Sequence, residues 1–174
     1  DKSSGFGGIV SQFFSRFLWE GTQTIIGYAV SMGKNLFSDV DNVEYYRGAT
    51  YLIDYNASKE NGMTIGSYIN INTLEKDASS SKVFDNGSFN PANGELFVHE
   101  YGHYLQSQKY GPLYLPAFAL PSLYSAWKWS RSVHASFYTE IDASTRAAAF
   151  WGFTYDKWFE TYENDALSLY PGML

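Results

Sequence analysis

The sequence predicts a mixed α+β domain in which a small antiparallel sheet follows one helix and precedes two more. Residues 9–32 space their apolar side chains three and four positions apart, as an amphipathic helix does. Residues 43–72 are instead rich in β-branched and aromatic residues, a composition typical of strands. Helical signals return at residues 95–110 and 139–151. Because 174 residues is the size of one domain, we expect residues 1–174 to fold as a single unit.

The composition narrows the classes of protein to which the chain can belong. With 45% apolar and 17% charged residues, it is neither disordered nor a charge-rich coiled coil. It has no cysteine, which excludes a disulfide scaffold and thiolate metal sites. Its 12 basic and 18 acidic residues give a net charge of −6 without a basic stripe, so we expect no nucleic-acid partner. No run of about 18 apolar residues occurs, so we expect no membrane span.

The first predicted helix has an apolar face. The pattern is interrupted near Gly21 and ends around Gly33, since glycine favours helix ends. Its polar face is poor in Lys and Arg, unlike that of helices that lie on a membrane surface. We therefore expect the apolar face to cover the core of the domain. The residues of this face are Phe13, Phe14, Phe17, Leu18, Ile25, Ile26, Ala29 and Met32.

The predicted sheet comprises two or three antiparallel strands. Residues 43–53 form one strand pattern, and residues 64–72 partly alternate between polar and apolar side chains. Between them, the polar residues 56–62 end in Asn61-Gly62, a pair typical of hairpin turns. Residues 74–93 are rich in Ser, Asn, Asp and Gly and predict a loop.

Glycine and proline delimit the helices that follow the sheet. The helix over residues 95–110 is expected to stop at Gly111-Pro112. Residues 114–123 are apolar but contain two prolines, which predicts a buried irregular connection. The last helix covers residues 139–151, where consecutive alanines favour close packing against another helix.

One motif carries recognisable chemistry. Residues 99–103 read His-Glu-Tyr-Gly-His, the H-E-x-x-H pattern. Four positions apart on a helix, His99 and His103 lie on one face and can bind a single metal ion through their imidazoles. Glu100 lies on an adjacent flank, where its carboxylate can reach a water molecule at that ion. The motif, placed on a predicted helix, therefore indicates a zinc-dependent hydrolase.

A catalytic zinc site needs a third protein ligand and keeps one position open. One class of zinc peptidases takes it from a histidine six residues after the motif, but Lys109 stands at that position and excludes this class. The downstream candidates are Glu140, His134 and Asp142.

Glu140 is the favoured third ligand. Ala143 and Ala147 lie on its own helical face, and their small side chains would let this helix pack closely against the helix of the two histidines. Asp142 lies on another side of the same helix and can pair with Arg146 at the i+4 position.

Other residues have candidate roles in peptide hydrolysis. His134 or Tyr138 could donate a hydrogen bond to the oxyanion that forms on an attacked peptide. A surface position is the competing interpretation of His134, and the one that we favour. Residues 64–72 could supply an edge strand that pairs with an extended substrate, although an ordinary sheet strand has the same pattern.

These residues resemble the gluzincin class of zinc metallopeptidases, in which a downstream glutamate completes the H-E-x-x-H site. More narrowly, most of the chain resembles C-terminal domains that follow Rhs-type repeats in Bacteroidetes. The matching stretches are residues 19–28, 48–50, 64–72, 99–107, 121–123 and 139–143. The resemblance implies a compact zincin-like domain, with an active-site helix and a following third-ligand helix, at the effector end of a secreted or surface-displayed protein. This chain has no Rhs repeat, so a toxin role does not transfer with the domain.

The sequence therefore predicts a metallopeptidase that binds one Zn2+ through His99, His103 and Glu140. Glu100 would be the general base, and the substrate a protein or peptide. One alternative is a non-catalytic binding module whose metal site is closed by a fourth ligand from the remaining candidates. Another is an effector domain held inactive by an inhibitory partner protein. We expect an exported or cell-surface bacterial protein whose export signal is not in this chain.

Overall fold

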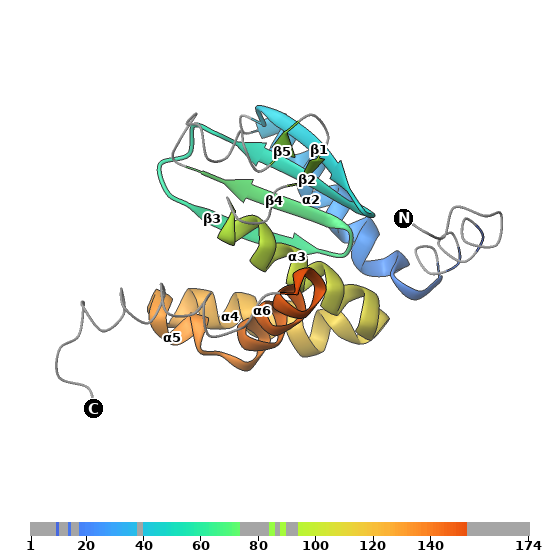
Figure 1. The fold of residues 1–174 in the computed structure, drawn as a ribbon, viewed down its shortest axis with the longest axis vertical. Coiled ribbons are helices and arrows are strands. Elements are labelled where there is room, and N and C mark those ends of the chain that lie inside the picture. Colours follow the sequence, from blue (N-terminus) through green and yellow to red (C-terminus); the bar gives the residue numbers. More distant parts are fainter. Residues whose placement is uncertain are drawn as a thin grey trace.

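A four-stranded sheet with helices on both of its faces forms the centre of an α+β fold (Figure 1). This computed structural model describes residues 10, 14, 18–37, 40–73, 84–85, 88–89 and 94–152. It confirms the α+β class that the sequence predicts. In chain order, the elements are α2 (Gly21–Phe37), β1 (Asn42–Tyr46), β2 (Ala49–Asp54), β3 (Asn61–Ile65), β4 (Tyr68–Asn72), β5 (Phe84–Asp85), β6 (Ser88–Phe89), α3 (Glu95–Tyr110), η3 (Gly111–Leu113), η4 (Leu115–Ala119), α4 (Leu120–Lys128), α5 (Arg131–Ala135) and α6 (Tyr138–Trp151).

The sheet has the strand order β1-β2-β4-β3 and is mixed. It has four strands instead of the predicted two or three, because residues 43–53 are divided between β1 and β2. β1 pairs antiparallel with β2, and β3 with β4, but the central pair of β2 and β4 is parallel. The prediction of a purely antiparallel sheet is therefore wrong at its centre. A turn at Gly66, where φ is 61°, divides residues 64–72 between two strands and reverses the chain, so that β4 runs in the same direction as β2. The parallel pair arises because β4, and not β3, lies next to β2. Asn61-Gly62, predicted as a turn, lies at the start of β3 instead.

Helices cover the two faces of the sheet. Asn70 of β4 hydrogen-bonds Ser31 of α2, with 3.0 Å between Nδ2 and Oγ. Successive strand residues point to opposite faces, so Ile69 and Ile71 of the same strand face the core beneath α3. This core is formed by Ala49, Tyr51, Ile53, Ile69, Ile71, Phe97, Tyr101 and Tyr104. Burial of β2 and β4 on both faces is typical of a parallel central pair.

Helix α2 turns a polar and small-residue side toward the sheet. A methyl group at Gly27 would overlap the carbonyl of Ile65, so the helix can approach the β3–β4 hairpin only without a side chain there. Ile25, by contrast, is exposed. The prediction that the apolar face covers the core is therefore wrong for the described part of the helix. The helix also continues past Gly33 to Phe37. Its buried residues are Gln23, Gly27 and Ser31.

The helices after the sheet follow the sequence prediction except in one segment. Helix α3 ends at Tyr110, before Gly111-Pro112, and α6 occupies the predicted place of the last helix. Residues 114–123, predicted to be irregular, are helical in η4 and α4. The prolines do not interrupt this segment: Tyr114, Ala119 and Leu120, which flank η4 and begin α4, all have helical dihedral angles.

Two further predictions concern the loop and the membrane. Of the predicted loop at residues 74–93, the structure describes only the short antiparallel hairpin of β5 and β6, and the rest lies outside the described residues. Within the described part of the chain, no helix has both the length and the apolar character needed to cross a bilayer.

Candidate metal centre

Helix α3 carries both histidines of the motif, and helix α6 brings Glu140 to them. His99 and His103 lie one turn apart on α3, and Glu140 lies in the first turn of α6. The two helices approach each other at Gly102, where a methyl group would overlap the carbonyl of Ala143. Small residues therefore allow the close packing that the sequence predicts between these helices.

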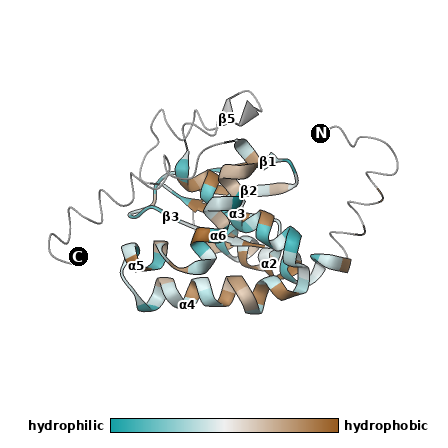
Figure 2. Cartoon of the chain, turned by 60° about the horizontal axis from the view of Figure 1, so that its bottom comes forward, coloured by the Kyte–Doolittle hydropathy of each residue, from teal (hydrophilic) through white to brown (hydrophobic). Residues whose placement is uncertain are grey.

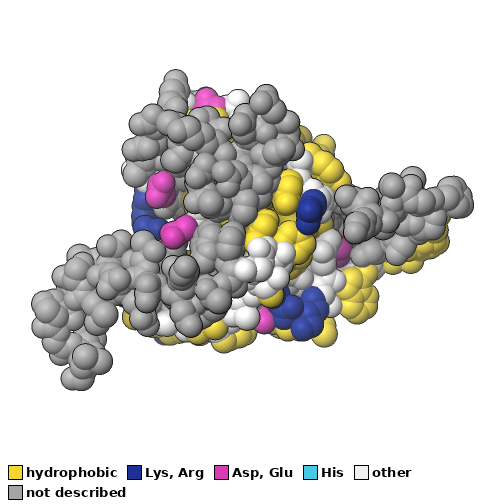
Figure 3. All heavy atoms as spheres, viewed as in Figure 1, with side chains coloured by type: hydrophobic (Ala, Val, Ile, Leu, Met, Phe, Trp, Pro, Cys, Tyr) yellow, Lys and Arg dark blue, Asp and Glu magenta, His cyan; other side chains and the backbone are white. Residues whose placement is uncertain are grey.

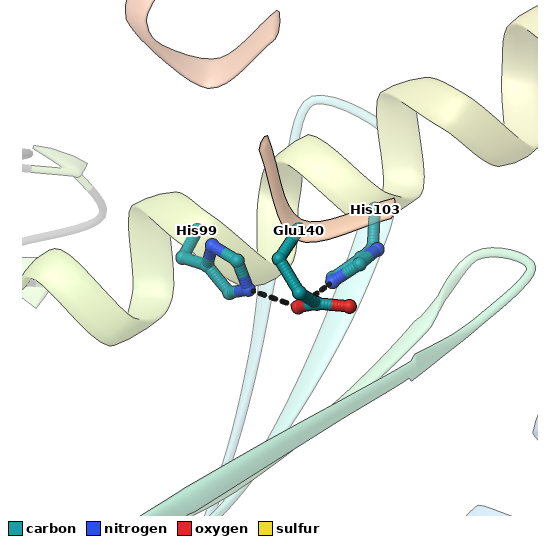
Figure 4. Close-up of side chains that lie close together, drawn as sticks. All are labelled: His99, His103 and Glu140. Carbon is teal, nitrogen blue, oxygen red and sulfur yellow. Dashed lines mark hydrogen bonds and ion pairs between the residues drawn. The ribbon is translucent and has the colours of Figure 1, made fainter. Parts of the chain in front are cut away.

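The three side chains converge on one point (Figure 4). His99 Nε2 lies 3.0 Å and His103 Nε2 lies 3.1 Å from the same oxygen, Oε2 of Glu140. The three residues offer ligand atoms that all lie within 4.8 Å of one another. His103 and Glu140 are buried, whereas His99 is partly exposed, so the cluster is most open to solvent at His99.

Gln106 fixes the tautomer of His103. Its Oε1 lies 2.8 Å from His103 Nδ1, and its amide nitrogen donates to the Thr139 carbonyl at 2.8 Å and to Asp142 Oδ2 at 2.9 Å. Because the amide nitrogen is used on those two acceptors, the amide oxygen faces the ring and His103 Nδ1 must donate. Nε2 is then the ring atom that binds either a proton or a metal ion: with a proton it donates to Glu140 Oε2 at 3.1 Å, and without one it offers a metal its lone pair.

Asp142 lies outside the group of ligand atoms. Its carboxylate accepts hydrogen bonds from Gln106 and from Arg146, whose Nε lies 2.7 Å from Oδ2. The i,i+4 pair with Arg146 that the sequence predicts is confirmed. Although burial raises the pKa of Asp142, hydrogen bonds from Arg146 and Gln106 lower it below its ordinary value. Asp142 is therefore a carboxylate that holds Gln106 in place.

Burial and neighbouring charge shift the pKa values of His103 and Glu140 in opposite directions. Burial lowers the pKa of His103, but the Glu140 carboxylate outweighs it and raises this pKa to about 9. Burial in turn raises the pKa of Glu140, yet His103 and His99 together hold it well below its ordinary range. At neutral pH, a proton on His103 thus balances the buried carboxylate. A divalent cation would take over this role and release the proton.

Glu100, the candidate general base, lies between α3 and the edge strand β3. The residue is buried, and its Oε2 accepts a hydrogen bond of 2.6 Å from Thr64 Oγ1. Its other oxygen, Oε1, faces Gly62, where a methyl group would overlap the carboxylate. Thr64 thus fixes one oxygen of Glu100, and the absence of a side chain at Gly62 leaves room for the other.

His134 faces the cluster from α5, so its interpretation as a surface histidine is wrong. Its Nε2 lies 3.7 Å from Glu140 Oε2. Its Nδ1 lies 2.6 Å from Ser125 Oγ, which donates its own proton to the Ser122 carbonyl at 2.8 Å. The ring must then donate from Nδ1, which leaves the lone pair on Nε2. Burial lowers the pKa of His134, so it is neutral at pH 7 and would need a proton before it could donate to an oxyanion.

Tyr138, the other candidate donor to an oxyanion, uses its hydroxyl proton elsewhere. Its OH donates to the Ala117 carbonyl at 2.6 Å, and half of the residue is exposed. This contact joins the start of α6 to η4. A catalytic role for Tyr138 stays a prediction, and it would require the hydroxyl to leave Ala117.

Sequence patterns alone miss several residues that hold the site. Gln106 could have been found, because it follows His103 by three residues and shares its helical face. Gly62, Thr64 and Ser125 come from elements distant in sequence and carry no local signal. Comparisons with protein-family models, curated proteins and solved structures found no match for this chain. Its function is therefore inferred from the geometry of the site.

Proposed function

We propose that the protein is a zinc-dependent metallopeptidase of the gluzincin type. The observation that supports this most strongly is the convergence of His99 Nε2 and His103 Nε2 on one oxygen of Glu140. Two imidazole nitrogens and one carboxylate oxygen are a ligand set typical of catalytic zinc. The hydrogen bond of His103 Nδ1 adds to the fit, because it leaves Nε2, the atom that faces Glu140, to bind a metal once its proton is released.

The residues around the cluster suit the hydrolysis of a peptide bond. Zinc bound there would polarise the peptide carbonyl and lower the pKa of a coordinated water. Glu100 would take the proton of the attacking water and return it to the leaving amine. Because Thr64 holds Oε2, the atom that accepts this proton is Oε1, beside Gly62.

Strand β3 is the part of the sheet that we propose to pair with an extended peptide. It lies at an edge of the sheet and contacts α3, whereas β4, which holds the second half of the predicted strand, is interior. The Thr64 carbonyl already accepts a hydrogen bond of 2.9 Å from Tyr114. Pairing with a substrate is therefore restricted to the part of β3 before Thr64, next to Glu100. An edge strand beside the H-E-x-x-H helix supports a zincin-like fold.

One observation favours a second function, a metal-binding module without catalysis. His134 presents a lone pair 3.7 Å from Glu140 Oε2, so a small shift would bring it to the metal as a fourth ligand. Structural zinc sites have four protein ligands, whereas catalytic sites keep one position open. X-ray absorption of the zinc-loaded protein distinguishes the two functions. It should find two imidazole ligands in a peptidase and three in a closed module.

The Glu100→Gln variant tests the peptidase. Because Glu100 is not a ligand in this proposal, the variant should retain zinc and fold like wild type. Its kcat on a peptide selected from a library should nevertheless fall about 10²–10⁴-fold, since the proton acceptor is lost. Glu60→Gln, at an exposed position outside the site, is the matched control and should leave kcat unchanged.

Three outcomes would count against this function. Unchanged turnover of Glu100→Gln would reject Glu100 as the base. Loss of zinc together with activity would make Glu100 a ligand. Absence of hydrolysis by the zinc-loaded wild type on every peptide of the library would favour the non-catalytic module.

A further inference from the structure

Helix α4 buries a polar residue and exposes apolar ones, the opposite of what a helix packed on a core does. Its buried residue is Ser125, whereas Leu123 and Trp127 are 59% and 82% exposed. We refer to Leu120, Leu123, Tyr124 and Trp127 as the α4 face. They follow the i, i+3, i+4, i+7 spacing of one helical side, and all are exposed. Figure 2 shows α4 at the lower border of the structure, with brown hydrophobic segments among paler and teal ones.

Cations border the α4 face. Lys128 Nζ donates to the Tyr124 hydroxyl at 2.8 Å and lies 5.2 Å from the centre of its ring. Arg131, which is exposed, follows at the start of α5. Residues 101–139 contain no Asp or Glu, although the chain has 18 acidic residues and a net charge of −6. The stretch of sequence that contains the α4 face is therefore free of acidic residues, in a chain that is acidic as a whole.

We propose that the α4 face docks on the surface of an anionic lipid bilayer. Trp and Tyr combine an apolar ring with a polar atom and are enriched where acyl chains meet water. Leucine side chains of an interfacial helix enter the acyl boundary, while Lys128 would meet anionic headgroups. In the view of Figure 3, apolar side chains appear along the lower edge of the described surface, with a few charged side chains among them.

A second copy of the chain is a poorer partner for this face. In a two-fold dimer the same patch of both copies forms the contact. Lys128 of one copy would then lie near Lys128 of the other, and like charges across an interface oppose association. An anionic bilayer supplies the opposite charge instead.

Docking would bring the cluster of His99, His103 and Glu140 close to the lipid. On the buried side of α4, Ser125 contacts His134 at 2.6 Å, and His134 lies 3.7 Å from Glu140. If the proposed function holds, the substrates would be peptide segments at the membrane surface. Docking itself does not depend on that function.

Sedimentation of the full chain with lipid vesicles tests the docking. Wild type should bind vesicles of phosphatidylglycerol and phosphatidylcholine at least tenfold more tightly than vesicles of phosphatidylcholine alone. Near an anionic surface each basic residue contributes about fivefold in affinity, so Lys128→Glu, which changes the charge by two, should weaken binding about 25-fold. Trp127→Ser should weaken binding to both kinds of vesicle at least tenfold.

Matched controls change exposed residues elsewhere. Lys59→Glu and Val43→Ser should bind anionic vesicles like wild type, and circular dichroism should show the same helix content in all variants. Equal affinity of wild type for both vesicles would overturn the anionic partner. Absence of binding to either would overturn lipid docking and leave a protein as the partner of the α4 face. A dimer in analytical ultracentrifugation that Trp127→Ser abolishes would assign the face to a second copy.

Discussion

Replacing Gln106 with leucine should weaken zinc binding without removing any ligand. Gln106 is fully buried and makes contacts of 2.8–2.9 Å with His103 Nδ1, the Thr139 carbonyl and Asp142. Leucine has a similar volume but can make none of them. His103 would then lose the acceptor that fixes its tautomer and the orientation of its ring.

The contacts of Gln106 determine the size of the effect. Loss of the hydrogen-bond partner of a metal-bound histidine typically lowers metal affinity about 10–100-fold. The metal-free protein should also lose stability, because a buried hydrogen bond contributes about 0.5–1.5 kcal/mol and a buried polar group left unpaired costs about 1–3 kcal/mol. Asp142 keeps Arg146, so the main unpaired group is His103 Nδ1. We expect the free energy of unfolding to fall by about 2–4 kcal/mol.

Two measurements separate these effects. Competition with a chelator gives the zinc affinity, and urea unfolding without zinc gives the stability. Gln108→Leu is the matched control, because Gln108 is on the same helix but is exposed and contacts Tyr104 rather than the cluster. Wild-type zinc affinity in Gln106→Leu, or an equal loss in Gln108→Leu, would refute the role assigned to Gln106.

Changes of pH should affect the metal-free and zinc-loaded proteins differently. The pKa of His103 is raised from 6.5 to about 9, so its ion pair with Glu140 stabilises the metal-free fold below pH 6.5 and is lost as the pH rises through 9. The urea midpoint of the metal-free protein should therefore fall between pH 6.5 and pH 9. Zinc affinity should rise over the same range, because zinc binding releases the His103 proton. If neither quantity changed with pH, the proposed link between the His103 proton and zinc binding would be contradicted. Gly62→Ala should lower kcat while zinc is retained, because the added methyl group overlaps the Glu100 carboxylate. Gly33→Ala, where nothing lies within 4 Å, should leave kcat unchanged, and equal kcat in both variants would mean that Glu100 tolerates displacement.

Helical spacing predicts the part of the site that a single helix contains. His99, Glu100 and His103 are close in sequence, so the geometry of α3 alone places the two imidazoles on one face. Glu140 required a further assumption, that two helices pack closely, and Ala143 provided the signal for it. The orientation of these side chains could not be predicted in the same way, because Thr64 and Ser125 come from distant elements.

The errors in the predicted fold have a common physical cause. Strand patterns indicate which residues are extended but not which strands become neighbours, so the parallel pairing of β2 with β4 has no local signature. In the same way, the buried side of α2 depends on its approach to the β3–β4 hairpin. Gly27 permits this approach, and the apolar residues of the helix are left exposed.

The zinc content of Glu140→Ala and Asp142→Ala tests the central claim most directly. Both variants remove a carboxylate from the first two turns of α6, but only Glu140 lies within the group that includes His99 and His103. Mass spectrometry after zinc loading and gel filtration should find zinc retained by wild type and largely by Asp142→Ala, and lost from Glu140→Ala. Equal zinc retention in the two variants would contradict the proposed site.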